Sequence, residues 1–322
     1  MSDIQPLDRN SCVYIAGHNG LAGSAIWRAM EAHGFTDLVG ARSADVDLRD
    51  RDATFAYMQK IQPDAVVLAA ARVGGIAAND TYPADFLSEN LRIQVNVMDS
   101  AFAASVDRLL FLGSSCIYPK FAEQPIKESS LLTGSLEPTN DAYAVAKIAG
   151  IFQVKASRKQ FGVHWISAMP TNLYGPNDNF DQQSGHVLPS LIAKFHDAMV
   201  ERRDTVALWG SGSPRREFLH ANDLGNAVVT ILDRYDAPEP INVGFGDDLK
   251  ISELAEIIAD EVGFRGRITY DSGQPNGTPR KMLDSRQIRS LGWRPAISLK
   301  DGVRSTYEWY VESKTGPSRD SR

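Results

Sequence analysis

Short apolar runs alternate with longer amphipathic stretches through the first half of the chain. The apolar runs predict buried strands, and stretches with apolar residues at helical spacing predict helices. Strands and helices in this alternating order predict βαβ units, so we expect an α/β fold with a doubly wound parallel sheet of the Rossmann type. The expected strands are 12–16, 38–41, 65–70, 109–112 and 165–169, and the expected helices are 21–33, 53–61, 90–104 and 143–160.

After residue 170 the pattern is more broken. Turn-rich segments at 172–185, 209–214 and 271–280 interrupt shorter periodic pieces, of which 253–262 is a clear amphipathic helix. This change predicts a second, smaller lobe that closes over the sheet. We expect a Rossmann domain over 11–172, to which the chain returns around 219–245, and a smaller α/β lobe that is mainly 173–322.

Composition and charge narrow the class of protein. The chain has 322 residues, is 43% hydrophobic and carries a formal net charge of -6, so nothing favours nucleic acid or an anionic membrane as a partner. No apolar run is long enough to cross a bilayer, and residues 1–10 lack the pattern of a secretory signal. The two cysteines, Cys12 and Cys116, do not suggest a disulfide scaffold. We therefore expect a cytoplasmic protein.

A glycine-rich segment, Gly17-His-Asn-Gly-Leu-Ala-Gly23, lies directly between the first expected strand and the first expected helix. Its three glycines allow a tight turn, close approach of the backbone to a pyrophosphate, and close packing of the helix. The start of the helix adds free N–H groups and a favourable dipole for phosphate. A glycine-rich surface turn is the alternative, but this position in the chain favours a dinucleotide site.

The residues after the second expected strand bear on the choice of dinucleotide. NAD sites usually place a carboxylate at the tip of this strand, where it binds the ribose 2′-hydroxyl. Here the strand ends Val39-Gly-Ala-Arg-Ser43, without an acid. Arg42 can pair with a 2′-phosphate through its guanidinium, or it can be a solvated loop arginine. We favour NADP(H), with Asp47 and Leu48 at the adenine edge.

Tyr143 and Lys147 are four residues apart, on one face of an expected helix. A tyrosine is a weak acid, with an ordinary pKa of about 10, and we expect the lysine charge to lower that pKa. The segment Gly113-Ser-Ser-Cys116 follows the strand 109–112, at the edge where open parallel sheets bind ligands. Ser114 or Ser115 can therefore donate to a substrate carbonyl beside Tyr143. This combination predicts a reductase.

These three features together resemble the extended short-chain dehydrogenase/reductases that act on nucleotide sugars. The resemblance runs from about residue 12 to residue 310, and its Ser-Ser-Cys-Ile-Tyr-Pro-Lys segment is highly specific. It is closest to the GDP-L-fucose synthase family, the 3,5-epimerase-4-reductases of GDP-4-keto-6-deoxy-D-mannose. The segments that carry it are Ala70-Ala-Arg-Val-Gly-Gly-Ile76, Asn79-Asp-Thr-Tyr-Pro-Ala-Asp85, Phe111-Leu-Gly-Ser-Ser-Cys-Ile-Tyr-Pro-Lys120, Glu137-Pro-Thr-Asn140, Pro170-Thr-Asn-Leu-Tyr-Gly-Pro176 and Gly277-Thr-Pro-Arg-Lys281.

The resemblance implies epimerisation followed by reduction in one pocket. The C4 ketone of the family's substrate acidifies the hydrogens at C3 and C5, so inversion there needs a base, an acid and stabilisation of the enolate oxygen. Cys116 resembles the family's base and His186 its acid, although each alone would be read as a packed thiol or a loop histidine. NADPH supplies the hydride to C4, Tyr143 protonates the oxygen, and Ser114 polarises it.

The resemblance also implies the ligand contacts. A GDP-sugar needs cations in an otherwise acidic protein, and the matching positions are Lys194, Arg216 and Lys281, with Trp209 beside the nucleotide or sugar. The reaction uses no metal, and the family forms homodimers through the helices expected at 90–104 and 143–160. The residues expected at the cofactor are Gly17, Asn19, Gly20, Leu21, Gly23, Arg42, Asp47, Leu48, Ala70, Ser114, Tyr143, Lys147, Pro170, Asn172, Leu173 and His186.

Two departures and several rival functions qualify this interpretation. Asn19 stands where the family usually has an arginine at the 2′-phosphate, and Ser43 stands at the position of a second arginine, one place after Arg42. Both reduce the expected preference for NADP. The rivals are a GDP-L-colitose synthase, a GDP-sugar 4-epimerase, and a non-catalytic dinucleotide sensor. A 4,6-dehydratase is disfavoured, because Cys116-Ile117 stands where that reaction needs an acid–base pair.

Overall fold

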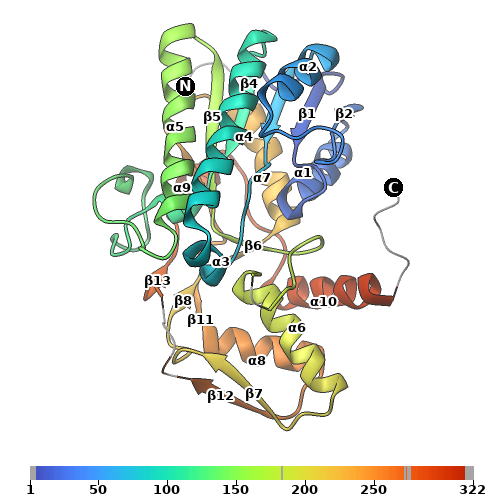
Figure 1. Cartoon of the computed structure of the whole chain (residues 1–322), viewed down its shortest axis with the longest axis vertical. Helices are drawn as coiled ribbons and strands as arrows, with labels where there is room; N and C mark the ends of the chain where they lie inside the picture. The colour runs from blue at the N-terminus through green and yellow to red at the C-terminus, as the bar shows by residue number, and fades with distance from the viewer. Residues whose placement is uncertain (1–4, 183, 272, 274–276, 316–322) are drawn as a thin grey trace.

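A parallel sheet of six strands forms the centre of the larger lobe in the computed structural model, which describes residues 5–182, 184–271, 273 and 277–315 (Figure 1). The strand order is β10-β5-β4-β3-β1-β2, and every neighbouring pair is parallel. From β1 the chain adds β2 on one side, and it then crosses back to add β3, β4 and β5 on the other side. The strand order therefore reverses at β1. The expected doubly wound α/β fold is confirmed. The strands are β1 (Cys12–Ala16), β2 (Asp37–Val39), β3 (Ala65–Leu68), β4 (Arg108–Leu112), β5 (His164–Pro170) and β10 (Ile241–Val243).

Helices cover both faces of this sheet because its strands are apolar on both sides. In β1, Val13 and Ile15 pack into the core beneath one helical layer, whereas Tyr14 and Ala16 pack into the core beneath the other. The first layer contains α1 (Leu21–Ala32) and α7 (Ala221–Arg234), which contact each other closely. The second layer contains α2 (Arg51–Ile61), α4 (Pro83–Ala103) and α5 (Asp141–Phe161), and the short α3 (Ile76–Thr81) precedes α4.

The smaller lobe lies below the sheet in Figure 1 and has its own apolar core. This core is built from α6 (Val187–Val200), α8 (Ile251–Val262) and α10 (Leu299–Thr315), beside the parallel pair β7 (Thr205–Trp209) and β12 (Arg267–Asp271). Two small sheets lie between the lobes. One sheet has three strands, β11 (Leu249–Lys250), β8 (Arg215–Arg216) and β13 (Arg280–Lys281), and the other has two, β6 (Asn172–Tyr174) and β9 (Phe218–His220). The remaining elements are α9 (Arg286–Ser290) and the short turns η1 (Ser115–Ile117) and η2 (Glu128–Ser130).

The structure differs from the sequence-based expectations mainly beyond residue 170. The segment 172–185, expected to be turns, begins with β6, and the helices α6, α7 and α10 were not expected. Helix α4 begins at Pro83 rather than at residue 90, since a proline is well accommodated in a first helical turn. None of the helices in the described part of the chain is both long and apolar enough to span a membrane.

Candidate active site

A cavity of about 1470 Å³ opens along the carboxyl edge of the sheet and extends to the smaller lobe. This volume exceeds the roughly 300–1,000 Å³ of an ordinary small-molecule pocket, and it suits two ligands side by side. The structure places every site residue expected from the sequence in the lining of this cavity, including residues as distant in the chain as Gly17 and Lys281.

The glycine segment forms a tight turn between β1 and α1. Gly17 has a φ of +85°, and a Cβ there would lie 2.8 Å from the backbone of Ala70, just beyond the end of β3. A Cβ on Gly23 would lie 2.1 Å from the carbonyl oxygen of Gly17, so the helix packs directly on the turn. Gly20 is the N-cap of α1, and therefore no side chain competes for the first N–H groups of the helix. These features fit the pyrophosphate of a dinucleotide.

Charged side chains gather after β2, where an adenosine ribose would lie. Arg42 forms an ion pair of 2.8 Å with Asp45, and both side chains are about half exposed. Asp47 forms an ion pair of 2.9 Å with Arg49. Arg49 is not among the residues that the sequence predicts at the cofactor. The carbonyl oxygen of the neighbouring Leu48 accepts a hydrogen bond from a helix α4 side chain. Both guanidinium groups therefore lie at the cavity rim, already oriented by acids.

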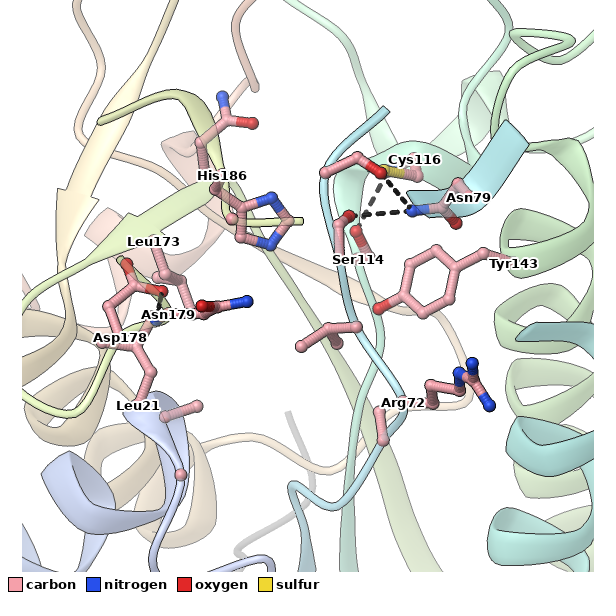
Figure 2. Close-up of a pocket in the computed structure, with 18 of the residues that line it drawn as sticks. Leu21, Arg72, Asn79, Ser114, Cys116, Tyr143, Leu173, Asp178, Asn179 and His186 are labelled. Carbon is pink, nitrogen blue, oxygen red and sulfur yellow. Dashed lines mark hydrogen bonds between the residues drawn. The ribbon is translucent and has the colours of Figure 1, made fainter. Parts of the chain in front are cut away.

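Tyr143, Lys147 and Ser114 meet where β4 and α5 approach each other. Lys147 is buried, and its Nζ donates to the carbonyl oxygen of Leu112 at 2.9 Å and lies 5.9 Å from the centre of the Tyr143 ring. Ser114 caps the turn η1, with its Oγ accepting from the N–H of Cys116 at 3.3 Å. Figure 2 shows the tyrosine hydroxyl pointing into the cavity beside Ser114.

The electrostatics of the tyrosine and lysine differ from the expectation. Burial raises the pKa of Tyr143 well above its ordinary value, as does its proximity to Cys116, while a hydrogen bond with Ser114 acts in the opposite direction. Burial also lowers the pKa of Lys147 to about 7. The expected lowering of the phenol pKa by the lysine charge is therefore wrong in this structure, because desolvation dominates both groups. Tyr143 is a protonated phenol at neutral pH, which is the form that a proton donor needs.

Two donors converge on the sulfur of Cys116. Asn140 Nδ2 and Lys281 Nζ each lie 3.5 Å from Cys116 Sγ, one from the start of α5 and the other from β13. The cysteine is half-buried and forms no disulfide. A thiolate that forms at this sulfur has a cation and an amide donor within reach, which is the environment that reactive cysteines use.

His186 lies on the opposite wall of the cavity from Cys116, Ser114 and Tyr143 (Figure 2). It is the N-cap of α6, and its side chain makes no capping hydrogen bond. Desolvation by the surrounding protein lowers the pKa of His186, and the positive charge of Lys281 lowers it further, so the imidazole is neutral at pH 7. A reacting carbon between the two walls would have a sulfur on one face and an imidazole on the other.

The substrate end of the cavity is cationic and has an aromatic edge. Arg216 and Lys281 are register partners on the adjacent strands β8 and β13. Lys194, from α6, donates to the carbonyl oxygen of Ala207 at 2.5 Å. Trp209 is 63% exposed and lines the cavity, so its ring offers a face for stacking. Pro170, Asn172 and Leu173 continue the wall from β5 into β6.

The structure adds lining residues that the sequence reasoning did not select. Asn79 is buried and donates to the carbonyl oxygens of Gly74 and Gly75, which fixes this loop in the wall of the cavity. Asn140 contacts the cysteine as described. Both lie in segments that carry the family resemblance, which was the available signal. Among the described residues no group of three His, Cys, Asp or Glu side chains is arranged to hold a metal ion.

Comparison with known proteins agrees with this geometry. A model of the NAD dependent epimerase/dehydratase family matches residues 13–244. GDP-L-fucose synthase 1 of Arabidopsis thaliana is 53% identical over 306 residues, which cover 95% of each chain. The GDP-L-colitose synthase of Yersinia pseudotuberculosis is 33% identical over 304 residues, which cover 94% of this chain and 98% of that protein.

Among solved structures, a GDP-L-fucose synthetase from Naegleria fowleri bound to NADP superimposes with a TM-score of 0.88 at 26% identity, over 96% of this chain and 97% of that one. The resemblance stated from the motifs is thereby confirmed. The chain belongs to the NAD dependent epimerase/dehydratase family and, within it, to the GDP-L-fucose synthases.

Proposed function

We propose that the protein converts GDP-4-keto-6-deoxy-D-mannose to GDP-L-fucose, by epimerisation at C3 and C5 followed by NADPH-dependent reduction at C4. The observation that carries this proposal is that Cys116 and His186 face each other across the cavity that also contains Ser114, Tyr143 and Lys147. A reductase alone needs only the last three side chains. The added pair on opposite walls supplies the chemistry that inverts a carbon centre.

In the epimerisation, Cys116 removes the proton from the carbon next to the ketone, and His186 returns a proton to the other face. Lys281 and Asn140 stabilise the Cys116 thiolate before it accepts the proton from the sugar. The enolate oxygen lies against Tyr143 and Ser114, whose hydroxyl groups donate to it. His186 takes up a proton from solvent, which its exposed position at the cavity allows, donates it to the carbon as the imidazolium, and returns to the neutral imidazole.

In the reduction, a bound dinucleotide would supply the hydride that C4 accepts. Tyr143 gives its proton to the oxygen, and its raised pKa keeps that proton in place until then. Lys147 lies beside the ring of Tyr143 and would hold the nicotinamide ribose of the cofactor, while Ser114 positions the sugar carbonyl. Because the same hydroxyl groups serve both stages, the sugar has no need to leave the cavity between them.

We assign the cofactor as NADP(H). The support is the absence of an acid at the tip of β2 and the presence of Arg42 at the cavity rim. Arg42 is paired with Asp45, so binding of a 2′-phosphate requires the arginine to turn from that acid. Asn19 and Ser43 add neutral hydrogen-bonding groups where the family usually has arginines. The ratio of kcat/KM for NADPH to that for NADH tests the assignment, and a ratio below one contradicts it.

Each lobe is proposed to bind a different ligand. Residues 11–172, with the returning segment 219–245, hold the cofactor, and 173–322 mainly hold the GDP-sugar. Lys194, Arg216 and Lys281 contact the GDP-sugar, and Trp209 packs beside the base or the sugar. A cysteine that acts as a base must stay reduced, and both cysteines are free, which favours the cytoplasm.

The protein is also proposed to be a homodimer. Helices α4 and α5 expose large apolar side chains on one surface: Val95, Phe102, Val145, Phe152 and Phe161 are 38–48% exposed. The rings of Phe102 and Phe161 lie 4.2 Å apart, so the two helices form a continuous apolar stripe. A second copy of this stripe would bury it in a four-helix interface. Sedimentation equilibrium tests this state, and a monomer at micromolar concentration contradicts it.

The test of the function is analysis of the product. Incubation with GDP-4-keto-6-deoxy-D-mannose and NADPH should yield GDP-L-fucose by NMR, with one NADP⁺ formed for each sugar consumed. Conversion of the keto sugar without formation of NADP⁺ would indicate redox-neutral epimerisation and contradict net reduction at C4. Faster turnover of the 3-deoxy keto sugar would favour a GDP-L-colitose synthase. Binding of NADPH without turnover of either sugar would leave a dinucleotide sensor.

A further inference from the structure

The two cations at the substrate end of the cavity stand on very short strands. β8 and β13 contain two residues each, and their register pairs Arg216 with Lys281 and Arg215 with Arg280. Strands in globular proteins usually have about 3–10 residues, because shorter ones contribute few backbone hydrogen bonds. Interactions of the side chains must therefore help to fix where the two cavity-facing cations point.

The side chains on the other face of these strands supply that interaction. Successive residues in a strand point to opposite faces. Arg216 and Lys281 line the cavity, whereas Arg215 and Arg280 are absent from its described lining. Both of these outer arginines reach one carboxylate, that of Asp248, which directly precedes the third strand of the sheet, β11. Figure 1 places this sheet between the two lobes.

Asp248 bridges the two strands with close contacts. Its Oδ1 accepts from Arg215 Nε at 2.6 Å, its backbone oxygen accepts from Arg215 Nη2 at 2.5 Å, and its Oδ2 accepts from Arg280 Nε. The carboxylate side chain is only 2% exposed, whereas those of Arg215 and Arg280 are 36% and 44% exposed. The acid is therefore enclosed by its two partners.

The negative charge of the Asp248 carboxylate offsets the repulsion between Arg215 and Arg280. Arg215 and Arg280 are direct cross-strand neighbours, and like charges in that position destabilise a sheet. Burial acts to raise the pKa of Asp248, but the hydrogen bonds from Arg280 and Arg215 lower it below its usual range. The acid is therefore ionised at neutral pH, and it changes a repulsive pair of arginines into a bridge.

We propose that Asp248 is a positioning residue for substrate binding, which fixes the register of β8 and β13 and thereby aims Arg216 and Lys281 into the cavity. The proposal rests on the proposed function, in which these cations contact the GDP-sugar. The position of Lys281 also affects the epimerisation, because its Nζ lies 3.5 Å from Cys116 Sγ. Asp248 itself does not line the cavity in the described residues.

The test replaces Asp248 with asparagine, which keeps the shape and removes the charge. The matched control is Glu261→Gln in α8 of the same lobe. Glu261 is 8% exposed and also pairs with two cations, Arg304 at 2.9 Å and Lys300 at 3.6 Å, but it is outside the described cavity lining. Both variants should lose some thermal stability. Only Asp248→Asn should weaken binding of GDP to the NADP⁺-saturated protein, on the order of 10- to 100-fold, the scale for a displaced binding group.

A double-mutant comparison separates positioning from general damage. In a chain that already carries Arg216→Ala and Lys281→Ala, Asp248→Asn should weaken GDP binding little further, because the groups through which it acts are gone. An unchanged GDP affinity in the single variant, or a full effect in the background without the two cations, would overturn the proposal. The affinity for NADPH should stay unchanged, and an equal loss there would also overturn it.

This experiment is independent of turnover. If the wild-type protein binds GDP but leaves GDP-4-keto-6-deoxy-D-mannose unchanged, the proposed function fails, while the GDP titrations still decide the role of Asp248. If the wild-type protein turns over the sugar, the KM of the Asp248→Asn variant should rise more than its kcat falls. The reverse pattern would contradict a role in substrate positioning.

Discussion

Replacement of Lys147 by methionine should change how stability depends on pH. Lys147 is 3% exposed in the structure, and burial lowers its pKa from 10.5 to about 7. Between these two pH values the unfolded chain carries a proton on this lysine that the folded chain lacks. The free energy of unfolding of the wild-type protein therefore rises with pH in this window, and the lysine contribution is lost as the pH falls towards 7.

The magnitude follows from the same two values. The full difference between about 7 and 10.5 corresponds to roughly 5 kcal/mol, at about 1.4 kcal/mol per pH unit. Between pH 7 and pH 9 the wild-type protein should gain about 2 kcal/mol relative to Lys147→Met, since methionine does not titrate. The variant also loses the hydrogen bond to Leu112, so the prediction concerns the change with pH and not the offset at one pH.

The assay is urea unfolding of nucleotide-free protein at pH 7, 8 and 9. Lys159→Met is the control, because Lys159 is exposed on the same helix. The difference between the wild-type protein and this control should stay constant with pH. Parallel pH dependence for the wild-type protein and Lys147→Met would contradict this expectation, because it would mean that the lysine stays charged inside the folded protein.

Three further substitutions test the site. Tyr143→Phe should abolish reduction of the keto sugar and leave NADPH binding intact, as measured by NADPH fluorescence; normal turnover would remove this tyrosine as the proton donor. Cys116→Ala should stop deuterium from solvent entering C3 and C5, by NMR, and undiminished exchange would exclude the thiol as the base. Gly23→Ala should destabilise the fold by about 1–3 kcal/mol, because its Cβ would lie 2.1 Å from the Gly17 carbonyl oxygen. Gly20→Ala is its control in the same urea titration, since that Cβ would lie at 3.5 Å from the same atom; equal losses would contradict the packing argument.

The features predicted well from the sequence are those set by neighbouring residues. The glycine turn depends on one strand, one turn and one helix in succession, and each has a local signature. The pairing of Tyr143 with Lys147 depends only on helical spacing, and Ser114 only on its position after an apolar strand. For these residues the chain order already determines the geometry, so the structure added distances and burial.

The features that were missed depend on contacts between distant residues. Helix α7 contains Gly225, which weakens a helical pattern, yet this glycine is required because a Cβ would lie 2.5 Å from the carbonyl oxygen of Ala25 in α1. Strands of two residues such as β8 and β13 carry no periodic signal. Lys281 and Cys116 are far apart in the chain, and only the folded lobes bring them together. The pKa of Tyr143 was wrongly expected to fall because burial is a property of the whole fold.

The proposed function is that one cavity inverts two carbon centres of the sugar and reduces a third. It is tested most directly by running the wild-type reaction in D₂O with GDP-4-keto-6-deoxy-D-mannose and NADPH, and reading the product by NMR. The expected product is GDP-L-fucose with deuterium at C3 and C5 and with the hydride from NADPH at C4. A product reduced at C4 that carries no deuterium at C3 and C5 would contradict it, because Cys116 and His186 would then face each other across the cavity without acting on the sugar.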